Sequence, residues 1–308
     1  MKNIILTGAT GFLGRNMVKC LCGHGYTVYA VVRPDSRNTG CLPLCDSLKI
    51  VYSPLEELSQ HMDEFPRECS AFYHFAWGGV NRSEINDEEI QNNNAALSEK
   101  VLGFAADIGC KVFIQAGSRS EYGLIDGKYS ENMECAPVVA YGRAKLRFSR
   151  FASGFCAANG IQYINPRIFS VYGYDDHPWS LIYTAVNKML KNEPMDLSLC
   201  TQSWNFMDVR DACDLMLTLY EKHHLIPPDD NGIFNVATDD IRPLREFINE
   251  IRTITHSSSR LNFGAFRQTA DSTYSVIPDM TKTYAVFDWR PKVTFDEGIR
   301  YMITKLGE

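Results

Sequence analysis

A glycine-rich turn near the start of the chain constrains the fold more than any other feature. Gly8, Gly11 and Gly14 are spaced G-x-x-G-x-x-G, between a short, largely apolar run at 2–6 and a helical pattern that ends near Cys22. Glycines at this spacing permit a tight strand-to-helix turn and let the backbone approach a pyrophosphate, toward which the helix N-terminus directs free N–H groups. Plain strand-to-helix turns carry similar glycines, but a second strand that ends about twenty residues later favours a dinucleotide site.

Apolar runs alternate with helical patterns through the first half of the chain. The sequence predicts strands at 26–32, 48–52, 71–75, 111–116 and 161–168, and long helices at 88–108 and 137–159, the second with Pro137 in its first turn. This alternation predicts an α/β fold, a Rossmann-type doubly wound parallel sheet with helices on both faces. The rhythm is lost beyond Tyr172, which indicates a smaller, interleaved α/β lobe toward the C-terminus. We therefore predict a dinucleotide-binding domain at 1–172 plus about 203–238, and a substrate-binding lobe at about 173–202 plus 239–308.

Composition and charge exclude several classes of function. The formal net charge is −6 and the basic residues are scattered, so the chain has no electrostatic reason to bind nucleic acid or an anionic membrane. No apolar stretch approaches the ~20 residues of a membrane span, and no signal-peptide pattern precedes the first strand. The ten cysteines lack metal-site spacing. We therefore expect no metal, and reduced, mostly buried thiols in a cytoplasmic protein.

The end of the second predicted strand bears on the choice of dinucleotide. A protein that prefers NAD usually places a carboxylate there for the ribose hydroxyls. In this chain Arg33 takes that position, followed by Asp35 and Arg37. An arginine can hold the 2′-phosphate of NADP through charge-assisted hydrogen bonds, whereas Asp35 could still turn toward the ribose of NAD. We expect NADP(H) as the preferred cofactor, with NAD(H) as the alternative.

Tyr141 and Lys145 form a Y-x-x-x-K pair near the start of the helix predicted at 137–159. The spacing places both side chains on one face, where the ammonium can lower the tyrosine pKa from its ordinary value of ~10. Such a tyrosine exchanges a proton with a substrate carbonyl or hydroxyl while hydride moves to or from a nicotinamide. Chance pairs of this kind also occur on surface helices. Ser118, which follows the strand at 111–116, can hydrogen-bond the reacting oxygen beside Tyr141, although a lone serine there is more often a turn former.

The order of these motifs resembles the extended short-chain dehydrogenase/reductases that act on nucleotide sugars: epimerases, dehydratases and, nearest, 4-keto reductases. The resemblance covers nearly the whole chain. The segments that carry it are Thr7–Gly14, Tyr73-His74-Phe75-Ala76, Asn94, Ser118 with Tyr122-Gly123, Tyr141–Lys145, Pro166–Gly173 and Trp289–Gly298.

The resemblance implies roles for individual residues. Tyr141 would be the general acid/base, Lys145 would hold the cofactor ribose and tune Tyr141, and Ser118 would polarise the substrate oxygen. The other expected cofactor-binding residues are Gly8, Thr10, Gly11, Phe12, Leu13, Gly14, Arg33, Phe75, Ala76, Asn94 and Ile168. The two long helices would form the surface of a homodimer, as is usual in this family.

Departures from the family pattern reduce the number of reactions that the chain is expected to catalyse. Family dehydratases have an Asp-Glu pair directly after the residue that matches Ser118, whereas this chain has Arg119 and Ser120. The acid and base that expel water are missing, so dehydration is not expected. Reductase–epimerases that invert carbons beside the ketone use a cysteine and a histidine. Ser120 takes the cysteine position and His177 is displaced from that of the histidine, which disfavours this reaction too.

Two catalytic functions then remain. The sequence favours NADPH-dependent reduction of a nucleotide-linked 4-keto-6-deoxy sugar, because Arg33 suits an exchangeable NADPH. The alternative is an NAD-dependent nucleotide-sugar 4-epimerase. A non-catalytic NADP-sensing protein is a third interpretation, but such proteins typically lose the tyrosine or the lysine, and this chain keeps both.

Substrate contacts are expected from Ser118 and Ser120 and from three residues nearer the C-terminus. Ser170 replaces a common asparagine of the family, and Trp204 replaces a common arginine and could stack on a base or sugar. Arg267 is the candidate for clamping the diphosphate of a nucleotide sugar. An ordinary half-buried tryptophan and a surface arginine would explain Trp204 and Arg267 equally well.

Overall fold

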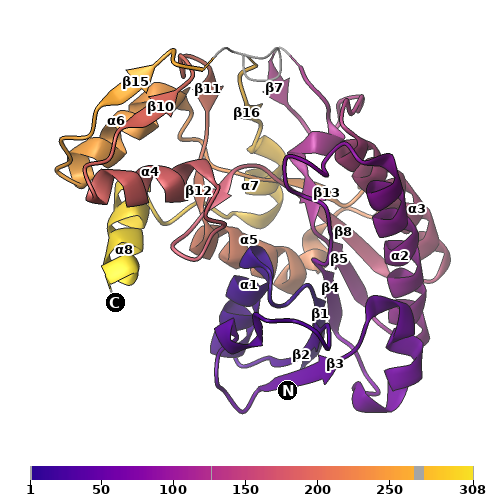
Figure 1. Cartoon of the computed structure of the whole chain (residues 1–308). Helices are drawn as coiled ribbons and strands as arrows, with labels where there is room; N and C mark the ends of the chain where they lie inside the picture. The colour runs from indigo at the N-terminus through magenta and orange to yellow at the C-terminus, as the bar shows by residue number, and fades with distance from the viewer. Residues whose placement is uncertain (1, 126, 267–273, 308) are drawn as a thin grey trace.

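A parallel sheet forms the centre of the molecule (Figure 1). The computed structural model describes residues 2–125, 127–266 and 274–307. In these ranges the sheet has eight strands, seven of them in the order β13-β8-β5-β4-β1-β2-β3, and all its pairings are parallel. They are β1 (Asn3–Thr7), β2 (Thr27–Val32), β3 (Leu48–Tyr52), β4 (Ala71–His74), β5 (Val112–Gln115), β8 (Gln162–Ile168), β13 (Ile233–Val236) and the short β6 (Gly117–Ser118), which pairs with β8. The predicted Rossmann-type sheet is confirmed.

Helices cover both faces of the sheet (Figure 1). Because side chains alternate along a strand, Ile4 and Ile5 of β1 belong to two different buried clusters, one on each face. The cluster around Ile4 takes in α1 (Phe12–Gly23) and α5 (Val209–Glu221), and the cluster around Ile5 takes in α2 (Glu88–Asp107) and α3 (Ala140–Ala158). With both faces covered, β4 and β5 are buried at every residue, which explains why the first three residues of each strand are hydrophobic.

A smaller lobe lies beyond the carboxyl edge of the sheet, at the upper left of Figure 1. It contains α4 (Leu181–Leu190), β10 (Met195–Leu197), α6 (Leu244–Ile254), β15 (Leu261–Phe263) and α8 (Phe295–Gly307). Its core is a third buried cluster, in which the rings of Phe206, Phe247 and Phe295 pack against one another.

The chain passes between the two parts several times, which makes the lobe interleaved, as predicted. The short connecting pairs are β9 (Val171–Tyr172) with β12 (Met207–Asp208), β11 (Ser203–Trp204) with β14 (Arg242–Pro243), and β7 (Lys128–Tyr129) with β16 (Ile277–Pro278). After β16, Phe287 at the end of α7 (Thr281–Phe287) and Trp289 join the cluster on the α1 and α5 face of the sheet. Short 3-10 helices η1 (Thr39–Cys41), η2 (Leu55–Glu64), η3 (Arg119–Glu121) and η4 (His223–Leu225) complete the described elements. The domain boundaries proposed from the sequence stay a prediction.

The start of α3 differs from the prediction. The helix begins at Ala140, after an extended Val139 (φ −101°, ψ 150°), so Pro137 lies before the helix and not in its first turn. Val138 and Val139 are β-branched and favour extended backbone, which delays the helix by three residues. Tyr141 consequently lies in the first turn of α3.

Two further findings concern the described residues as a set. None of their helices is both long and apolar enough to cross a membrane. No three His, Cys, Asp or Glu side chains among them come close enough to hold a metal ion.

Candidate functional site

The phosphate loop lies at the carboxyl edge of the sheet, where β1 turns into α1. Gly8 has a φ of 72°, and a Cβ on it would lie 2.6 Å from the backbone nitrogen of Ala76. A Cβ on Gly14 would clash with the Gly8 carbonyl, because the first turn of α1 packs directly on the loop. Glycine alone suits these positions, and the bare backbone at a helix N-terminus fits the pyrophosphate of a dinucleotide.

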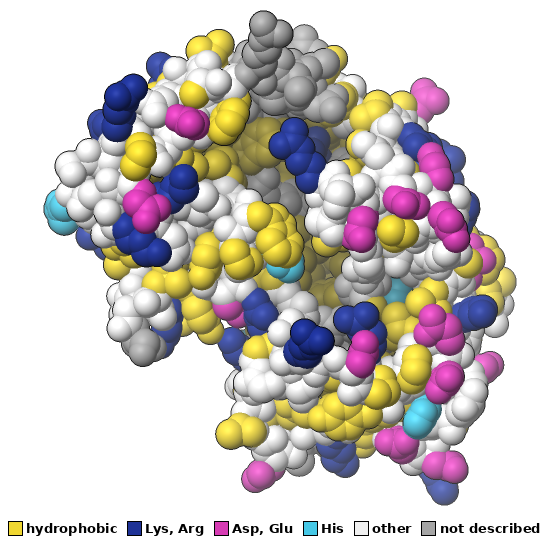
Figure 2. Space-filling model, in the orientation of Figure 1, with side chains coloured by type: hydrophobic (Ala, Val, Ile, Leu, Met, Phe, Trp, Pro, Cys, Tyr) yellow, Lys and Arg dark blue, Asp and Glu magenta, His cyan; other side chains and the backbone are white. Residues whose placement is uncertain are grey.

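Two neighbouring pockets extend from this loop and share Gly8, Gly11, Phe75 and Trp77. Figure 2 shows this face hollowed between the sheet and the smaller lobe. The cofactor-binding residues predicted from the sequence all line one pocket or the other. The first pocket has Phe12, Leu13, Gly14, Tyr141, Lys145 and Ile168, and the second has Thr10, Arg33, Ala76 and Asn94. The fold therefore brings the predicted set together, and its binding roles stay predictions.

Tyr141 and Ser118 meet in the first pocket. Ser118 ends β6, and Tyr141 reaches it from the first turn of α3. Burial raises the pKa of Tyr141 to about 12, and a hydrogen bond with the Ser118 hydroxyl acts in the opposite direction. The pKa of Tyr141 is therefore raised and not lowered as the Y-x-x-x-K spacing predicted, because burial outweighs the neighbouring groups, and the phenol is protonated at neutral pH, in the form that donates a proton.

Lys145 lies one helical turn further along α3 and is only 2% exposed. Its Nζ donates a hydrogen bond to the carbonyl oxygen of Ala116 at 2.8 Å and lies 5.8 Å from the centroid of the Tyr141 ring. Burial lowers the pKa of Lys145 to about 7, while the charge of Glu121 raises it. The charge state of this lysine near neutral pH is thus set by the groups around it.

Trp77 is a site residue that the sequence reasoning missed. The Lys145 ammonium lies 3.7 Å from the centroid of the Trp77 ring, which also meets the Tyr141 ring edge-on at 6.1 Å. The indole Nε1 donates to Gln91 Oε1 at 2.8 Å, which fixes the ring over the lysine. A large aromatic residue directly after Phe75 and Ala76, both expected to line the dinucleotide, was the signal that could have identified it.

The strand-end residues around Trp77 have structural partners. Asn94 on α2 accepts a hydrogen bond from the backbone nitrogen of Gly78 at 3.0 Å and donates to the Gly78 carbonyl at 2.9 Å. The His74 ring lies between Thr7 Oγ1 at 2.8 Å and Ser98 Oγ at 2.9 Å, and burial lowers its pKa to about 3. His74 is therefore a neutral packing residue beneath the site.

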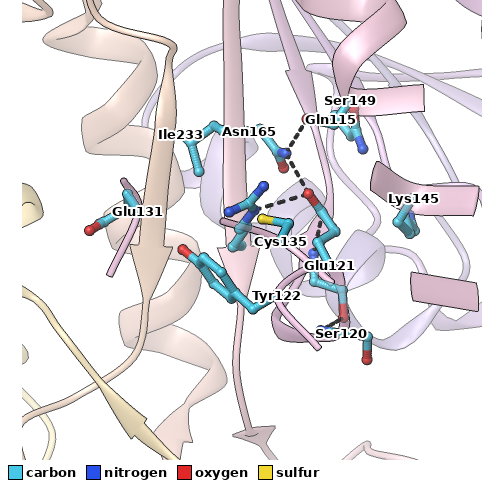
Figure 3. A network of polar contacts seen from close by, with 12 residues as sticks. Gln115, Ser120, Glu121, Tyr122, Glu131, Cys135, Lys145, Ser149, Asn165 and Ile233 are labelled. Carbon is cyan, nitrogen blue, oxygen red and sulfur yellow. Dashed lines mark hydrogen bonds and ion pairs between the residues drawn. The ribbon is translucent and has the colours of Figure 1, made fainter. Parts of the chain in front are cut away.

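Ser118 also caps the short helix η3. Its hydroxyl accepts a hydrogen bond from the Ser120 backbone nitrogen at 3.1 Å, while Glu121 Oε1 accepts one from the Ser118 backbone nitrogen at 2.8 Å. This reciprocal capping box holds the loop rigidly. Glu121 is a second residue that the sequence reasoning passed over as a functional group, although Ser118-x-x-Glu121 has the capping-box spacing. Figure 3 shows that its side chain turns toward Asn165, in the interior.

The substrate contacts predicted from the sequence are brought together only in part. Ser118 lines the first pocket. Trp204 Nε1 donates to Ser170 Oγ at 2.9 Å, so these two predicted residues satisfy each other. In the described part of the chain, Ser120, Ser170 and Trp204 line neither pocket. Arg267 lies outside the described residues.

His177 reaches the first pocket from the smaller lobe. It follows β9, lines the pocket and stacks on the Trp179 ring at a centroid distance of 4.5 Å. The loop that carries it is tied to α1 through Asp175, whose Oδ2 lies 2.7 Å from Arg15 Nε. This ion pair holds the loop of the lobe against the helix that follows the phosphate loop.

The outer end of the second pocket is open to solvent. Arg33 lies there beside Asn38 and Ser53. Its side chain is 76% exposed, and its Nε lies 4.0 Å from Oδ1 of Asp35, which is 83% exposed. Among the residues that the structure describes, Arg33 lines the second pocket, whereas Asp35 lines neither pocket, and the pair they form is screened strongly by water.

Comparisons with known proteins agree with this geometry. CDP-abequose synthase of Salmonella muenchen is 25% identical over 305 residues, which cover 98% of this chain and 97% of the relative. The dTDP-6-deoxy-L-talose 4-dehydrogenase (NAD(+)) of Aggregatibacter actinomycetemcomitans is 29% identical over 258 residues, covering 80% and 88%. The structure of UDP-glucose 4-epimerase from Thermotoga maritima superimposes with a TM-score of 0.86 at 21% identity, covering 99% of this chain and all of that one, and shows the shared fold.

The family assignment rests on the first 237 residues. The model of the NAD dependent epimerase/dehydratase family matches residues 4–237, which span the phosphate loop, Ser118, the Tyr141–Lys145 pair and the last strand of the sheet. The chain belongs to this family, in the extended short-chain dehydrogenase/reductase group.

Proposed function

We propose that this protein reduces the keto group of a nucleotide-linked 4-keto-6-deoxy sugar, with NADPH as the preferred cofactor. The observation that carries the proposal is the meeting of Ser118, Tyr141 and Lys145 in the pocket that begins at the phosphate loop. A bound reduced nicotinamide would supply the hydride. The chain itself has to orient the ketone and provide the proton.

Protonation favours the reductive direction. Tyr141, with its pKa raised to about 12 by burial, holds a proton across the physiological range and can give it to the oxygen of a bound ketone. The Ser118 hydroxyl, fixed by the η3 cap, can donate a hydrogen bond to the same oxygen. The Lys145 ammonium stabilises the phenolate that remains after proton transfer.

The loop after Ser118 supports reduction over dehydration. Dehydratases of the family place an acid and a base at the positions of Arg119 and Ser120. The nearest carboxylate in this loop, Glu121, is fully buried and ion-paired with Arg167 at 3.0 Å. Its hydrogen bonds occupy both of its oxygens, so it is poorly placed to take a proton from a sugar.

The names of two relatives support the position of the reaction and the class of sugar. One is a 4-dehydrogenase of dTDP-6-deoxy-L-talose, and dehydrogenation at C4 is the reverse of reduction of a 4-keto group. The other makes CDP-abequose. We infer that the substrate is a nucleotide-linked deoxysugar, and that the chain works in the cytoplasm.

Some observations support NADP as the preferred cofactor and others support NAD. Arg33 at the rim of the second pocket can pair with a 2′-phosphate. Asp35, 4.0 Å from Arg33, could instead bind ribose hydroxyls, and the name of one relative specifies NAD(+). Asp35 thereby also favours the second candidate, an NAD-dependent nucleotide-sugar 4-epimerase.

Outward-facing aromatic residues on α3 support a homodimer through α2 and α3. Phe151 is 41% exposed and stacks on Phe155 at a centroid distance of 5.8 Å. Large exposed apolar groups on paired helices are typical of association surfaces. Sedimentation of the purified protein should give the mass of a dimer, and Phe151→Glu should shift it to the monomer.

The test of function is consumption of reduced dinucleotide by the purified protein. We would follow the absorbance of NADPH, and separately NADH, with a panel of nucleotide-linked 4-keto-6-deoxyhexoses. Oxidation of NADPH with one member, abolished by Tyr141→Phe, is the expected result. No oxidation, together with NAD released from the denatured protein, would replace the reductase with the epimerase. Dinucleotide binding without either reaction would indicate a non-catalytic sensor.

A further inference from the structure

A fully buried ion pair lies behind the catalytic loop. Glu121 is 0% exposed and Arg167 of β8 is 1% exposed, and Arg167 Nε lies 3.0 Å from Glu121 Oε2. Burial opposes the charge on Arg167, but the Glu121 carboxylate holds the pKa of the guanidinium above its ordinary value. A pair this deep is weak support for stability, since apolar residues of similar volume often replace such pairs without loss. The position of the pair directly behind the catalytic loop therefore points to a role in the site.

The carboxylate of Glu121 joins the Ser118 loop to the catalytic helix (Figure 3). Its Oε1 accepts from the Ser118 backbone nitrogen at 2.8 Å, and its Oε2 accepts from Asn165 Nδ2 at 3.1 Å. Asn165 Nδ2 also donates to Ser149 Oγ at 2.8 Å, on the same helix as Tyr141 and Lys145. One carboxylate thus connects β6, β8 and α3.

Two glycines make room for this arrangement. A Cβ on Gly117 would lie 2.9 Å from Glu121 Oε1 and would clash with the Asn165 side chain. A Cβ on Gly142, directly after Tyr141, would clash with the carbonyl oxygen of Ser120. The loop and the helix therefore approach as closely as backbone allows, so a movement of Glu121 would be transmitted to both catalytic segments.

Glu121 is also the negative charge near Lys145: Lys145 Nζ donates to the Ala116 carbonyl, and Glu121 Oε1 accepts from the backbone nitrogen of Ser118, two residues further along the same segment. Three titratable groups act on or respond to this ammonium: Tyr141 on α3, His74 on β4 and Glu121 on η3. His74 is neutral, because burial lowers its pKa to about 3, and Tyr141 is neutral at physiological pH. Glu121 is thus the one among these three that favours the charged lysine.

We propose that Glu121 is a positioning residue for the catalytic group: its carboxylate fixes the Ser118 loop against α3 and maintains the positive charge of Lys145. Arg167 and Asn165 hold the carboxylate in place. The inference rests on the proposed function for the role of Ser118 in turnover. The effect on Lys145 can be measured without any sugar.

The experiment compares three variants with the wild type. Glu121→Gln keeps the side-chain shape and removes the charge, but leaves Arg167 buried and unpaired. The double variant Glu121→Gln with Arg167→Met removes the pair together and avoids that penalty. Glu131→Gln is the matched control, since Glu131 is 4% exposed and accepts a hydrogen bond from the Asn235 backbone nitrogen, apart from Ser118 and Lys145. The readout is the affinity for NADPH and for NADH, by fluorescence titration of the full-length protein, as a function of pH.

The wild type should lose affinity as the pH rises through the pKa of Lys145, because only the ammonium form offers three donors to a ribose. Loss of the Glu121 charge lowers that pKa, so the midpoint should move down in Glu121→Gln, and it should move less in the double variant, which also removes the opposing positive charge of Arg167. Glu131→Gln should keep the wild-type midpoint. A folded Glu121→Gln protein with an unchanged midpoint would overturn the proposal, as would a folded double variant that keeps the wild-type kcat.

Glu121→Asp and turnover separate the two parts of the inference. Glu121→Asp retains the charge and shortens the reach to Ser118, so its binding midpoint should stay and its kcat should fall at least tenfold with little change in KM. A midpoint that moves as far in Glu121→Asp as in Glu121→Gln contradicts the electrostatic role. If the wild type shows the expected midpoints but reduces no keto sugar, the proposed function fails and the action of Glu121 on Lys145 stands.

Discussion

The two ends of the predicted dinucleotide site are built in opposite ways. At the catalytic end, Lys145 is 2% exposed, and Glu121 and Arg167 behind it form an ion pair that is sealed from water. At the far end, Arg33 and Asp35 form a pair with exposed fractions of 76% and 83%. One end is held by packing and multiple hydrogen bonds, and the other by a single pair that solvent screens.

The difference indicates which properties of the protein are easy to change. A buried network has to be altered as a unit, because removing one member leaves an uncompensated charge. An exposed pair can be exchanged with little effect on folding, since surface ion pairs contribute only about 0–1 kcal/mol. We infer that the catalytic end tolerates few single substitutions. The preference between NADP and NAD, in contrast, can be changed with a few surface substitutions.

The largest effect should follow from Tyr141→Phe at the buried end. The substitution removes the proton donor and leaves the ring, which still packs against Trp77. We expect kcat to fall by roughly 10²–10⁴-fold, the usual contribution of a general acid. Steady-state kinetics with the keto sugar identified by the panel would measure it.

Tyr26→Phe is the control for loss of a tyrosine hydroxyl. Tyr26 donates to Glu221 at 2.6 Å, remote from the pockets, so kcat should match the wild type. Retention of more than about a tenth of the activity by Tyr141→Phe would remove Tyr141 from its assigned role.

Lys145→Met should raise the stability of the folded protein, an intermediate effect at the same end. Burial lowers the pKa of Lys145 to about 7 from an ordinary 10.5. Below pH 7 both folded and unfolded chains carry the proton, so folding bears the full cost of burying the charge. Between pH 7 and 10.5 the folded chain releases a proton that the unfolded chain keeps, so wild-type stability rises with pH. The variant should therefore unfold at higher denaturant concentration below pH 7, and its advantage should shrink toward pH 10.

Chemical denaturation at about pH 6 and about pH 9 would test the predicted direction of the stability difference between Lys145→Met and the wild type. Lys49→Met, at an exposed lysine on β3, should change stability by less than about 0.5 kcal/mol at either pH. A Lys145→Met protein that is less stable than the wild type at the lower pH contradicts the assignment of a costly buried ammonium.

How much of the site the sequence could predict depends on whether a feature involves residues that are close together or far apart in the sequence. The phosphate loop, the Tyr141–Lys145 pair and Ser118 were recognisable because each depends on local spacing: three glycines in one turn, two residues on one helical face, one residue after a strand. Local spacing also gave the parallel sheet, since strands alternating with helices leave few other arrangements. These parts of the site follow from neighbours in sequence.

The remainder depends on contacts between distant segments. Trp77 lies over Lys145, Glu121 meets Arg167, and Trp204 donates to Ser170, across 34 or more residues in each case. Sequence spacing carries no information on whether two polar side chains face a ligand or each other, so Ser170 and Trp204 were expected at the substrate and are bonded together. Pro137 was misplaced for a related reason, because a proline starts a helix only when the following residues accept helical backbone, and Val138 and Val139 do not.

Arg33→Ala, at the exposed end, should give the smallest of these effects, a change in the affinity for NADPH. It tests most directly the difference between the exposed end and the buried end. If Arg33 holds a 2′-phosphate, the variant should bind NADPH about tenfold more weakly and NADH almost unchanged. Because the contact is exposed, the wild-type affinity for NADPH should fall with added salt on the scale of a ~10 Å screening length, and the variant should show a flatter dependence. Arg67→Ala, just before β4 at the opposite edge of the sheet, should leave both affinities and the salt dependence intact. Equal binding of NADPH by the wild type and Arg33→Ala would assign this end of the pocket to Asp35 and to NAD, while the buried catalytic end would keep its role in either case.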